Sequence, residues 1–380
     1  MIILPIASGK GGVGKSLIAT NLSIALAETG KNVCLVDLDL GGSNLHTLLG
    51  MRSITKGIGT FLNSTKKNFD ELIVKTNYNG LLFIPGDTEI PGIANLSNSQ
   101  KNILLKRLLE LQVDFLVLDL GAGTSNNVVD FFLISGRGII VATPLVTSIL
   151  NAYLFLKNAV FRIMVTSFKR KSEATKYMEE LKKEGTPLQK LYFPQLLEKI
   201  QKIDPDSYNE FSKRVSTFKP CLIFNLLEDA KQSEKARQIK RSAYEYLDLE
   251  LEHLGVIYRD EFQNIALNSR LPLIKYKSNS IFAEAIYRIA DKIYQWKGED
   301  GAPLDIQSLE ESYQVADMEA RIDFQTKLEY IEELFHCEDF TKGDLIETIK
   351  NQQFEIEKLR KENDLIKVKL VNAISQGFLS

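Results

Sequence analysis

The sequence predicts an α/β protein with a doubly wound, mostly parallel β-sheet, and two features lead to this fold class. Short apolar runs recur along the chain, and most of them are separated by segments with apolar residues at helical spacing. Apolar runs of this kind suit parallel strands that are buried on both faces, and the alternation indicates helices that return the chain between strands. The expected strands lie at 2–6, 33–36, 81–84, 115–118, 138–142, 221–224 and 254–257.

Composition limits the class of protein. The chain has 47 Lys and Arg residues against 49 Asp and Glu residues, for a formal charge of -2, so no general basic field favours nucleic acid as a partner. The three cysteines, Cys34, Cys221 and Cys337, are scattered, which fits a reducing compartment and no disulfide framework. We find no signal peptide and no run of about 20 apolar residues, so the expectation is a cytoplasmic protein.

The loop after the first expected strand has the composition of a phosphate-binding site. Residues 9–16 read Gly-Lys-Gly-Gly-Val-Gly-Lys-Ser, and a helical pattern over 17–28 follows, with Gly30 as its expected C-cap. Glycines let backbone N–H groups converge on a phosphate at the N-terminus of a helix. Lys15 would reach the β- and γ-phosphates, and the Ser16 hydroxyl would bind Mg²⁺. The residues expected around ATP are Gly9, Gly11, Gly12, Val13, Gly14, Lys15, Ser16 and Leu17.

Acidic residues follow two further expected strands. Asp37 and Asp39 come at the end of the strand at 33–36, and Asp119 ends the strand at 115–118 and precedes Gly121 and Gly123. Each aspartate alone is more often a turn or cap residue. Carboxylates at the C-terminal ends of strands face the crevice where ligands bind in open α/β sheets. With the glycine loop, they indicate a site for nucleotide hydrolysis.

The remaining segments suggest additions to one α/β domain. We expect a P-loop ATPase domain over 1–297 with a Lys-rich helical insertion at about 162–219, and a linker and helical region over 298–344. Over 345–374 apolar residues alternate at steps of four and three, with Asn363 at a core position, which suits a two-stranded coiled coil. An amphipathic helix folded back on its own domain would produce the same stripe.

The motifs resemble those of the MinD/ParA family of deviant-Walker ATPases. The similar segments are the P-loop with its additional Lys10, the Asp37-Leu-Asp39 segment and the Asp-Leu-Gly-Ala-Gly segment at 119–123. They lie within about 1–160 and 220–295. The last segment, with Ala-Thr-Pro at 142–144, is most similar to the flagellar-placement (FlhG/FleN-like) branch. The resemblance implies a SIMIBI-type P-loop NTPase fold.

The resemblance also implies roles for individual residues. Lys10 would enter the active site of a second subunit and contact phosphate there, and Lys15 would act within its own subunit. Asp39 would orient the attacking water. Asp37 and Asp119, with Ser16, would support Mg²⁺, and Asn225 would read adenine.

The function expected on these grounds is a MgATP-binding and hydrolysing switch that dimerises around ATP and positions a cellular assembly: a flagellum, a division site or a chromosome. A protein partner would stimulate hydrolysis and recruit the protein to a pole or to the inner membrane face. The tail at 374–380 lacks the basic amphipathic pattern of a membrane anchor. The alternative is an ATP-binding adaptor that hardly hydrolyses ATP and organises partners through its coil. Metallocluster carriers would need paired cysteine ligands, which the sequence does not offer.

Overall fold

A computed structural model of the chain divides it into two compact units, Met1–Phe324 and Gln325–Ser380. It describes residues 1–336 except 41, 43, 52–55, 65–67, 87–95, 184–191 and 297–305, together with isolated positions between 350 and 363. The predicted coiled coil over 345–374 lies outside the described residues apart from those positions. It therefore stays a prediction.

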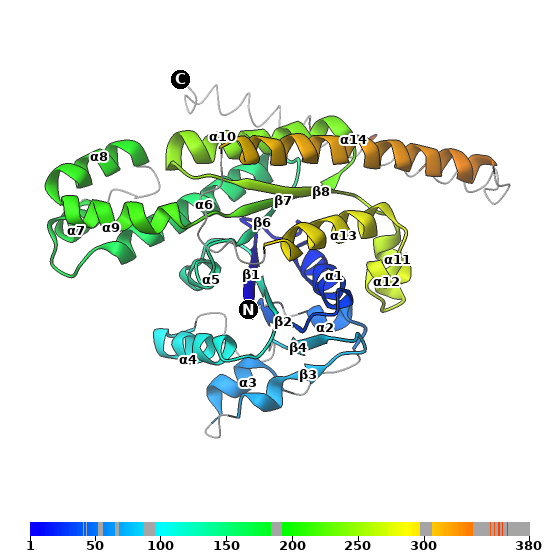
Figure 1. The fold of residues 1–380 in the computed structure, drawn as a ribbon, viewed down its shortest axis with the longest axis horizontal. Helices are drawn as coiled ribbons and strands as arrows, with labels where there is room; N and C mark the ends of the chain where they lie inside the picture. Colours follow the sequence, from blue (N-terminus) through cyan, green and yellow to red (C-terminus); the bar gives the residue numbers. More distant parts are fainter. Residues whose placement is uncertain are drawn as a thin grey trace. The chain divides into compact units, whose positions relative to one another are not determined.

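The first unit is built on an eight-stranded sheet in the order β3-β4-β2-β5-β1-β6-β7-β8 (Figure 1). All neighbouring strands are parallel except the short β3, which pairs antiparallel with β4. The doubly wound, mostly parallel sheet predicted from the sequence is thus confirmed. The strands are β1 (Ile2–Ala7), β2 (Val33–Leu38), β3 (Val74–Lys75), β4 (Leu81–Ile84), β5 (Phe115–Leu120), β6 (Ile139–Ala142), β7 (Cys221–Leu227) and β8 (Glu252–Tyr258).

Helices cover both faces of this sheet, as a doubly wound fold requires. One apolar cluster joins a face of the sheet to α4, α5, α6, α10 and the start of α14, and a second joins the other face to α1, α11, α12 and α13. The helices are α1 (Lys15–Glu28), α2 (Leu45–Leu48), α3 (Ile58–Asn63), α4 (Asn98–Leu109), α5 (Asn126–Phe132), α6 (Val146–Ser167), α7 (Glu173–Lys183), α8 (Phe193–Ile203), α9 (Pro205–Ser216), α10 (Ala236–Leu247), α11 (Phe262–Asn268), α12 (Leu273–Tyr276), α13 (Ile281–Tyr294) and α14 (Ile306–His336), with 3₁₀ turns at Asp70–Leu72 and Ala230–Lys235.

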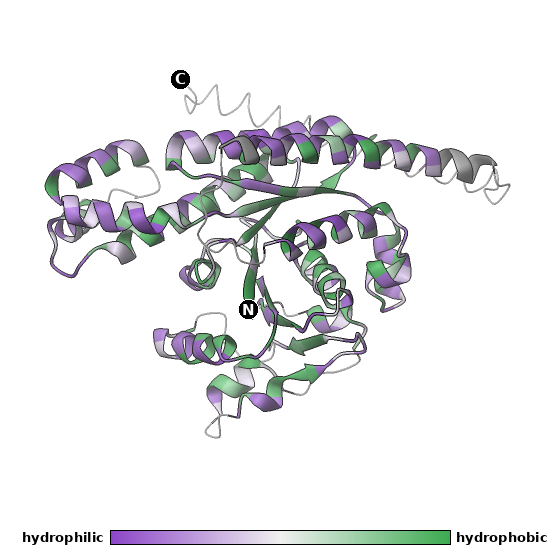
Figure 2. Cartoon of the chain, viewed as in Figure 1, coloured by the Kyte–Doolittle hydropathy of each residue, from purple (hydrophilic) through white to green (hydrophobic). Residues whose placement is uncertain are grey.

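The strands are buried because their side chains are apolar on both faces. Figure 2 shows the central strands as the most hydrophobic part of the fold, and nearly every residue of β2, β5 and β6 is buried. Helix α1 follows the same logic, with almost all of its side chains buried. It ends at Glu28, with Thr29 as its C-cap and not Gly30, which follows with a φ of 80° in the left-handed region that a glycine adopts without strain.

Helix α6 crosses the boundary of the predicted insertion. It runs without a break to Ser167, and the added helices α7, α8 and α9 follow it. By length and composition alone α6 could span a membrane, but 56% of its most apolar window is buried inside the protein. We therefore interpret α6 as a core helix. The sequence analysis had expected no long apolar segment and so did not identify it.

The first compact unit also extends further along the chain than the ATPase domain expected over 1–297. Residues at the start of α14, among them Tyr313 and Ala320, are buried against the sheet domain. This packing includes α14 up to Phe324 in the first unit.

Candidate nucleotide-binding site

The glycine loop connects the end of β1 to the start of α1, which begins at Lys15. Gly12 and Gly14 adopt φ angles of 79° and 90°, in the left-handed region that disfavours any residue with a Cβ atom. The Gly9 backbone lies so close to α6 that an added Cβ atom would come within 2.1 Å of the Asn151 carbonyl oxygen. The loop therefore needs glycine for its conformation at two positions and for close packing at a third.

Two hydrogen bonds tie this loop to neighbouring strands. The Asn225 side-chain amide, at the end of β7, donates to the Val13 carbonyl oxygen over 2.8 Å. The Gly123 N–H, after β5, donates to the Ser8 carbonyl oxygen over 3.1 Å. Asn225 is almost fully buried, and its amide nitrogen already binds the loop, so its role in reading adenine stays a prediction.

The predicted aspartates meet beside the start of α1. Asp37 and Asp119 are paired neighbours in the register of β2 and β5, and both are buried. Asp39 follows β2, and its carboxylate lies 3.3 Å from where a Cβ atom on Gly121 would stand. The fold thus brings together three carboxylates that are more than 80 residues apart at their extremes, as parallel strands do at their shared edge.

The Asp37 carboxylate forms hydrogen bonds with the backbone of the loop that follows β2. Its two carboxylate oxygens accept the backbone N–H groups of Asp39, over 3.1 Å, and of Leu45, over 3.3 Å. Leu45 is the first residue of α2. Asp37 therefore fixes the loop that carries Asp39.

Asp119 is buried, and its pKa is shifted by its surroundings. Its pKa is raised to about 7, mainly by burial and also by the carboxylates of Asp37 and Asp39, while Lys15 and a hydrogen bond from Ser16 oppose the rise. One of its oxygens is buried without a hydrogen-bond partner. A buried acceptor of this kind costs free energy unless a cation or donor satisfies it.

The donors present fit a magnesium ion. Mg²⁺ prefers oxygen ligands, keeps several waters and commonly takes only one or two protein carboxylates in addition to phosphate oxygens. The Ser16 hydroxyl and the unpartnered Asp119 oxygen would hold such an ion, with Asp37 behind them. Among the described residues, no group of three or more His, Cys, Asp or Glu side chains could hold a metal ion. The ion would therefore also need phosphate oxygens and waters as ligands.

The two lysines of the loop lie in opposite environments. Lys15 is 7% exposed and acts on Asp119 from within the site. Lys10 is exposed, and its ammonium group has no ion-pair partner among the described side chains. Of the two, only Lys10 is free to reach a molecule outside its own subunit.

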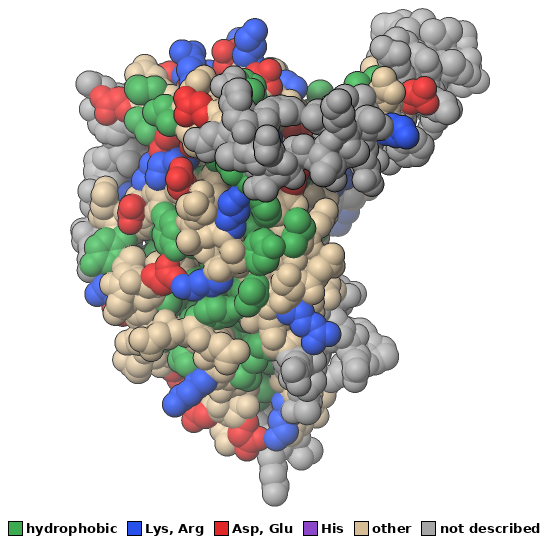
Figure 3. Space-filling model, turned by 90° about the vertical axis from the view of Figure 1, so that its right-hand side faces the viewer, with side chains coloured by type: hydrophobic (Ala, Val, Ile, Leu, Met, Phe, Trp, Pro, Cys, Tyr) green, Lys and Arg blue, Asp and Glu red, His purple; other side chains and the backbone are tan. Residues whose placement is uncertain are grey.

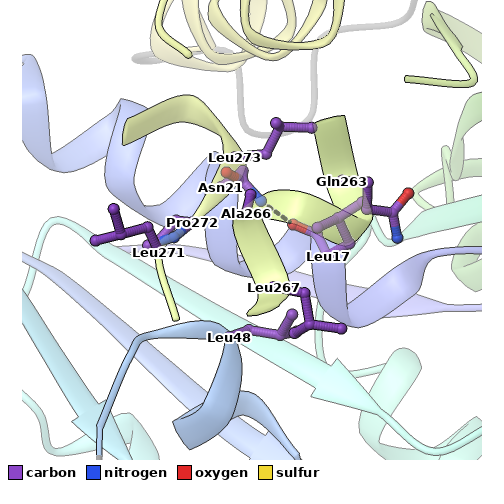
Figure 4. Close-up of a pocket in the computed structure, with 9 residues that line it drawn as sticks. All are labelled: Leu17, Asn21, Leu48, Gln263, Ala266, Leu267, Leu271, Pro272 and Leu273. Atoms are coloured by element: carbon purple, nitrogen blue, oxygen red, sulfur yellow. Dashed lines mark hydrogen bonds between the residues drawn. The ribbon is translucent and has the colours of Figure 1, made fainter. Parts of the chain in front are cut away.

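Leu17 faces away from the phosphate loop. Its side chain lines a small, mainly apolar pocket with Leu48 of α2 and with residues of the α11–α12 region (Figure 4). The pocket measures about 20 Å³, which holds about one water and is far too small for a nucleotide. The Asn21 side-chain oxygen accepts a hydrogen bond from the Ile274 N–H over 2.9 Å and so connects α1 to α12 beside the pocket. Only the Leu17 backbone is thus available to a nucleotide.

The outer wall of this pocket carries apolar side chains on the surface. On the face turned to the viewer in Figure 3, hydrophobic groups gather over α11 and α12. The exposed ones in this segment are Ile265, Leu267, Leu271 and Tyr276.

Sequence reasoning did not identify Asn151 or Ser8 as parts of the site. Asn151 comes from α6 and contacts Gly9, more than 140 residues away in the chain. The Ser8 hydroxyl donates to the Lys10 carbonyl oxygen over 2.7 Å and so shapes the loop. Ser8 could have been found from its place before Gly9, whereas no local signal marks Asn151.

Comparisons with known proteins match the part of the chain that carries the phosphate loop and the aspartates. Residues 1–154 match the ParA family model described as NUBPL iron-transfer P-loop NTPase. The chain is 30% identical over 157 residues to the antiactivator FleN of Pseudomonas aeruginosa, covering 41% of this chain and 55% of FleN. It is 33% identical over 156 residues to the flagellum site-determining protein YlxH of Helicobacter pylori, covering 40% and 52%. The match thus spans about half the length of these relatives.

A solved structure shares the fold. The septum site-determining protein MinD of Pyrococcus horikoshii, complexed with MgADP, superposes with a TM-score of 0.52 at 21% identity, covering 80% of this chain and 99% of that protein. The MinD of Aquifex aeolicus, solved in a complex with MinC, gives a TM-score of 0.51 at 18% identity and covers 80% and 98%. Residues 1–154 thus match the ParA family model and resemble MinD, FleN and YlxH in sequence. The fold is that of the solved MinD structures.

Proposed function

We propose that the protein is a MgATP-binding and hydrolysing switch that dimerises around ATP and positions a cellular assembly such as a flagellum, a division site or a chromosome. The observation that carries this proposal is the unsatisfied Asp119 carboxylate oxygen beside Lys15 and Ser16 at the N-terminus of α1. A nucleotide phosphate with Mg²⁺ is the ligand that satisfies all three groups and the partial positive charge of the helix terminus.

The residues of the chain divide the work of hydrolysis. The loop N–H groups and Lys15 would bind and orient the phosphates, and Mg²⁺, held by Ser16 and Asp119, would supply positive charge where the leaving group forms. Asp39 lies on the loop that Asp37 fixes, beside Gly121. From there its carboxylate would orient a water against the terminal phosphate. Lys10 would add its charge to the site of a second subunit.

An ATP-binding adaptor with little hydrolysis is the second candidate. It needs the same phosphate loop but no working Asp39. Turnover measured with the purified protein, alone and with candidate partners, separates the two functions. As part of the first candidate function, we propose that a protein partner stimulates hydrolysis. We also propose that the protein is cytoplasmic and is recruited to a pole or to the inner membrane face.

An iron-cluster carrier is a poorer fit, although the matching family model carries that description. The two described cysteines, Cys34 and Cys221, are buried on β2 and β7, with three strands between them in the sheet. Burial raises the pKa of Cys34 to about 12, whereas a cluster ligand must be a thiolate. Neither thiol can reach a cluster at a protein surface.

Calorimetry with ATP and Mg²⁺ tests the proposal. The wild-type protein should bind ATP, and Lys15→Ala should abolish binding, because the phosphates would lose the cation inside the loop. Asp39→Ala should keep binding and reduce hydrolysis by about 10²-fold or more, since it removes the group that orients the nucleophile. Unchanged affinity in Lys15→Ala would remove the phosphate-loop assignment, and unchanged turnover in Asp39→Ala would remove the role of Asp39.

A further inference from the structure

The first part of α14 covers the edge strand of the sheet. β8 is the last strand in the sheet order, and its outer edge would otherwise present unpaired backbone groups. The His253 N–H, on β8, donates to the Ser312 hydroxyl over 3.2 Å, and Tyr313 and Ala320 are buried against the domain. Figure 1 shows α14 beside α10 above β8. A helix near the end of the described chain is therefore part of the nucleotide-binding domain.

Ion pairs hold this part of α14 on both sides. Acidic residues of α14 meet basic residues of α10 on one side and of α13 on the other, at nitrogen–oxygen distances of 2.5 to 3.0 Å. The pairs are Arg237–Glu310, Arg237–Asp317, Lys240–Glu310, Arg288–Asp323 and Lys292–Glu319. The position of α14 is thus fixed by the fold along its length up to Phe324.

The docked part of α14 meets the carboxyl end of β8, at the edge of the sheet that also carries the phosphate loop. Asp37 and Asp119 stand on β2 and β5 and Asp39 follows β2, all to one side of β1, so we place the terminal phosphate and the cation there. We therefore place the nucleoside on the other side of β1, toward the carboxyl ends of β6, β7 and β8, because ligands of open α/β sheets bind at this edge. Asn225 at the end of β7 is the polar side chain already seen there.

Tyr258, the last residue of β8, connects α14 to this end of the site. Its hydroxyl donates to the Ala320 carbonyl oxygen over 2.7 Å, and its ring stacks on Phe324 with centroids 6.2 Å apart. The next residue, Arg259, donates its N–H to the Leu227 carbonyl oxygen on β7 over 2.9 Å. Leu227 follows Asn225 by two residues, so a short series of bonds runs from α14 to the phosphate loop.

We propose that Tyr258 is a positioning residue through which docked α14 holds the base end of the nucleotide site. This inference rests on the proposed function, because it presupposes ATP at the phosphate loop. Tyr258 acts on affinity for the nucleoside part of ATP and not on the phosphate chemistry. By thermodynamic linkage, ATP bound at that end stabilises the docked α14 by the same factor.

Matched hydroxyl deletions in the full chain test this inference. Tyr258→Phe removes the bond to Ala320 and keeps the ring, so the Kd for ATP should rise about two- to tenfold, the range for one lost hydrogen bond. Inorganic tripolyphosphate, which binds only the phosphate loop, should keep its Kd, and kcat at saturating ATP should stay unchanged while KM rises. The control is Tyr313→Phe, in the same helix interface, because the Tyr313 hydroxyl is buried without a hydrogen-bond partner in the described structure.

Hydrogen exchange gives a second readout of the same coupling. In the wild type, ATP should slow exchange of the amides at 313–324, and in Tyr258→Phe this effect should be weaker. The inference is overturned if Tyr258→Phe binds ATP as the wild type does, or loses affinity for ATP and tripolyphosphate equally. If the wild type binds neither tripolyphosphate nor ATP, the proposed function itself fails, and the inference fails with it.

Discussion

In the phosphate loop, Gly9 is required because a larger residue would clash with α6, and not because of its backbone conformation. An alanine at Gly9 would place its Cβ atom 2.1 Å from the Asn151 carbonyl oxygen, while an alanine at Gly11 would find its nearest neighbour, the Ala122 side chain, at 3.9 Å. The contact with Asn151 involves backbone, which cannot rotate away. The loop can therefore lie against α6 only with glycine at position 9.

We predict that Gly9→Ala destabilises the nucleotide-free protein by about 1–3 kcal/mol, the usual cost of overpacking, and weakens ATP binding by moving the loop. Gly11→Ala is the matched control and should leave stability within about 0.5 kcal/mol of the wild type. Chemical denaturation without nucleotide measures both. Equal stability of the two variants would show that the contact between the loop and α6 is not tight in solution.

His253 is a buried, uncharged imidazole under α14. Both ring nitrogens lack hydrogen-bond partners in the described structure, and the ring meets Tyr313 edge to face with centroids 5.0 Å apart. The pKa of His253 is lowered to about 3, mainly by burial and also by the cations of Lys292 and Arg237. The folded protein thus holds His253 neutral where an unfolded chain would protonate it.

This predicts a loss of stability in mild acid. Between pH 6.5 and 3 the unfolded state binds a proton at His253 that the folded state does not, so stability falls as pH falls, by up to about 1.4 kcal/mol per pH unit. His253→Leu removes the titrating group, so the stability of the variant relative to the wild type should improve by about 2 kcal/mol between pH 7 and pH 5. Urea unfolding at the two pH values checks this. A difference that does not change with pH would contradict the neutral, buried state.

At this scale the sequence predicted residues that are defined by their neighbours in the chain. The glycines, Lys15 and the aspartates after β2 and β5 could be placed because each follows an apolar run directly. The contact of Asn151 with Gly9 and that of Tyr258 with Ala320 join distant segments, and no local pattern encodes them. Asp37 was expected only near the metal, and its bonds to the loop of Asp39 became visible only in three dimensions.

At the scale of elements, α14 depends on ion pairs whose burial differs. The Asp323 side chain is only 2% exposed and lies 2.5 Å from Arg288 on α13. Burial raises the pKa of Asp323 to about 6, and Arg288 opposes this shift. By contrast, Arg241 and Glu245 form a pair on α10 that is largely exposed. The first pair should matter for the docking of α14 and the second should not.

We predict that Arg288→Ala destabilises the protein by about 2–4 kcal/mol at neutral pH, because it leaves the buried Asp323 carboxylate without its cation. The control, Arg241→Ala, should cost less than about 0.5 kcal/mol. Thermal unfolding of both variants gives the comparison. Similar small effects in both would mean that Asp323 is solvated and that α14 is held loosely at this end.

The strands were predictable because a short, continuous apolar run between helical segments suits a central parallel strand better than a surface element. The two-residue β3 was missed, since Val74–Lys75 is too short to form a pattern. The break assumed near residue 297 rested on Gly and Pro composition, which gives no information on whether the helix beyond it returns to the domain. The burial of Tyr313 and Ala320 against the domain could not be read from the heptad or charge pattern.

For the whole molecule, the proposed switch depends on a second copy of the chain. Lys15 is buried in its own site, while Lys10 is exposed beside it without an ion-pair partner among the described side chains. An exposed cation next to a phosphate loop can act on a nucleotide bound by another subunit, where negative charge develops during hydrolysis. The predicted coil over 345–374 would add a second contact between copies and stays a prediction.

Mixing two inactive variants tests this claim most directly. Lys10→Ala keeps Asp39 and Lys15 but supplies no lysine to its partner, and Asp39→Ala supplies Lys10 but cannot orient water in its own site. Each variant alone should bind ATP and hydrolyse it at least about 10²-fold more slowly than the wild type. If Lys10 acts across the dimer, one site of each mixed dimer is complete, and ATP turnover should reappear when the two are combined. A mixture that stays as inactive as its components would contradict a role for Lys10 in the site of a second subunit.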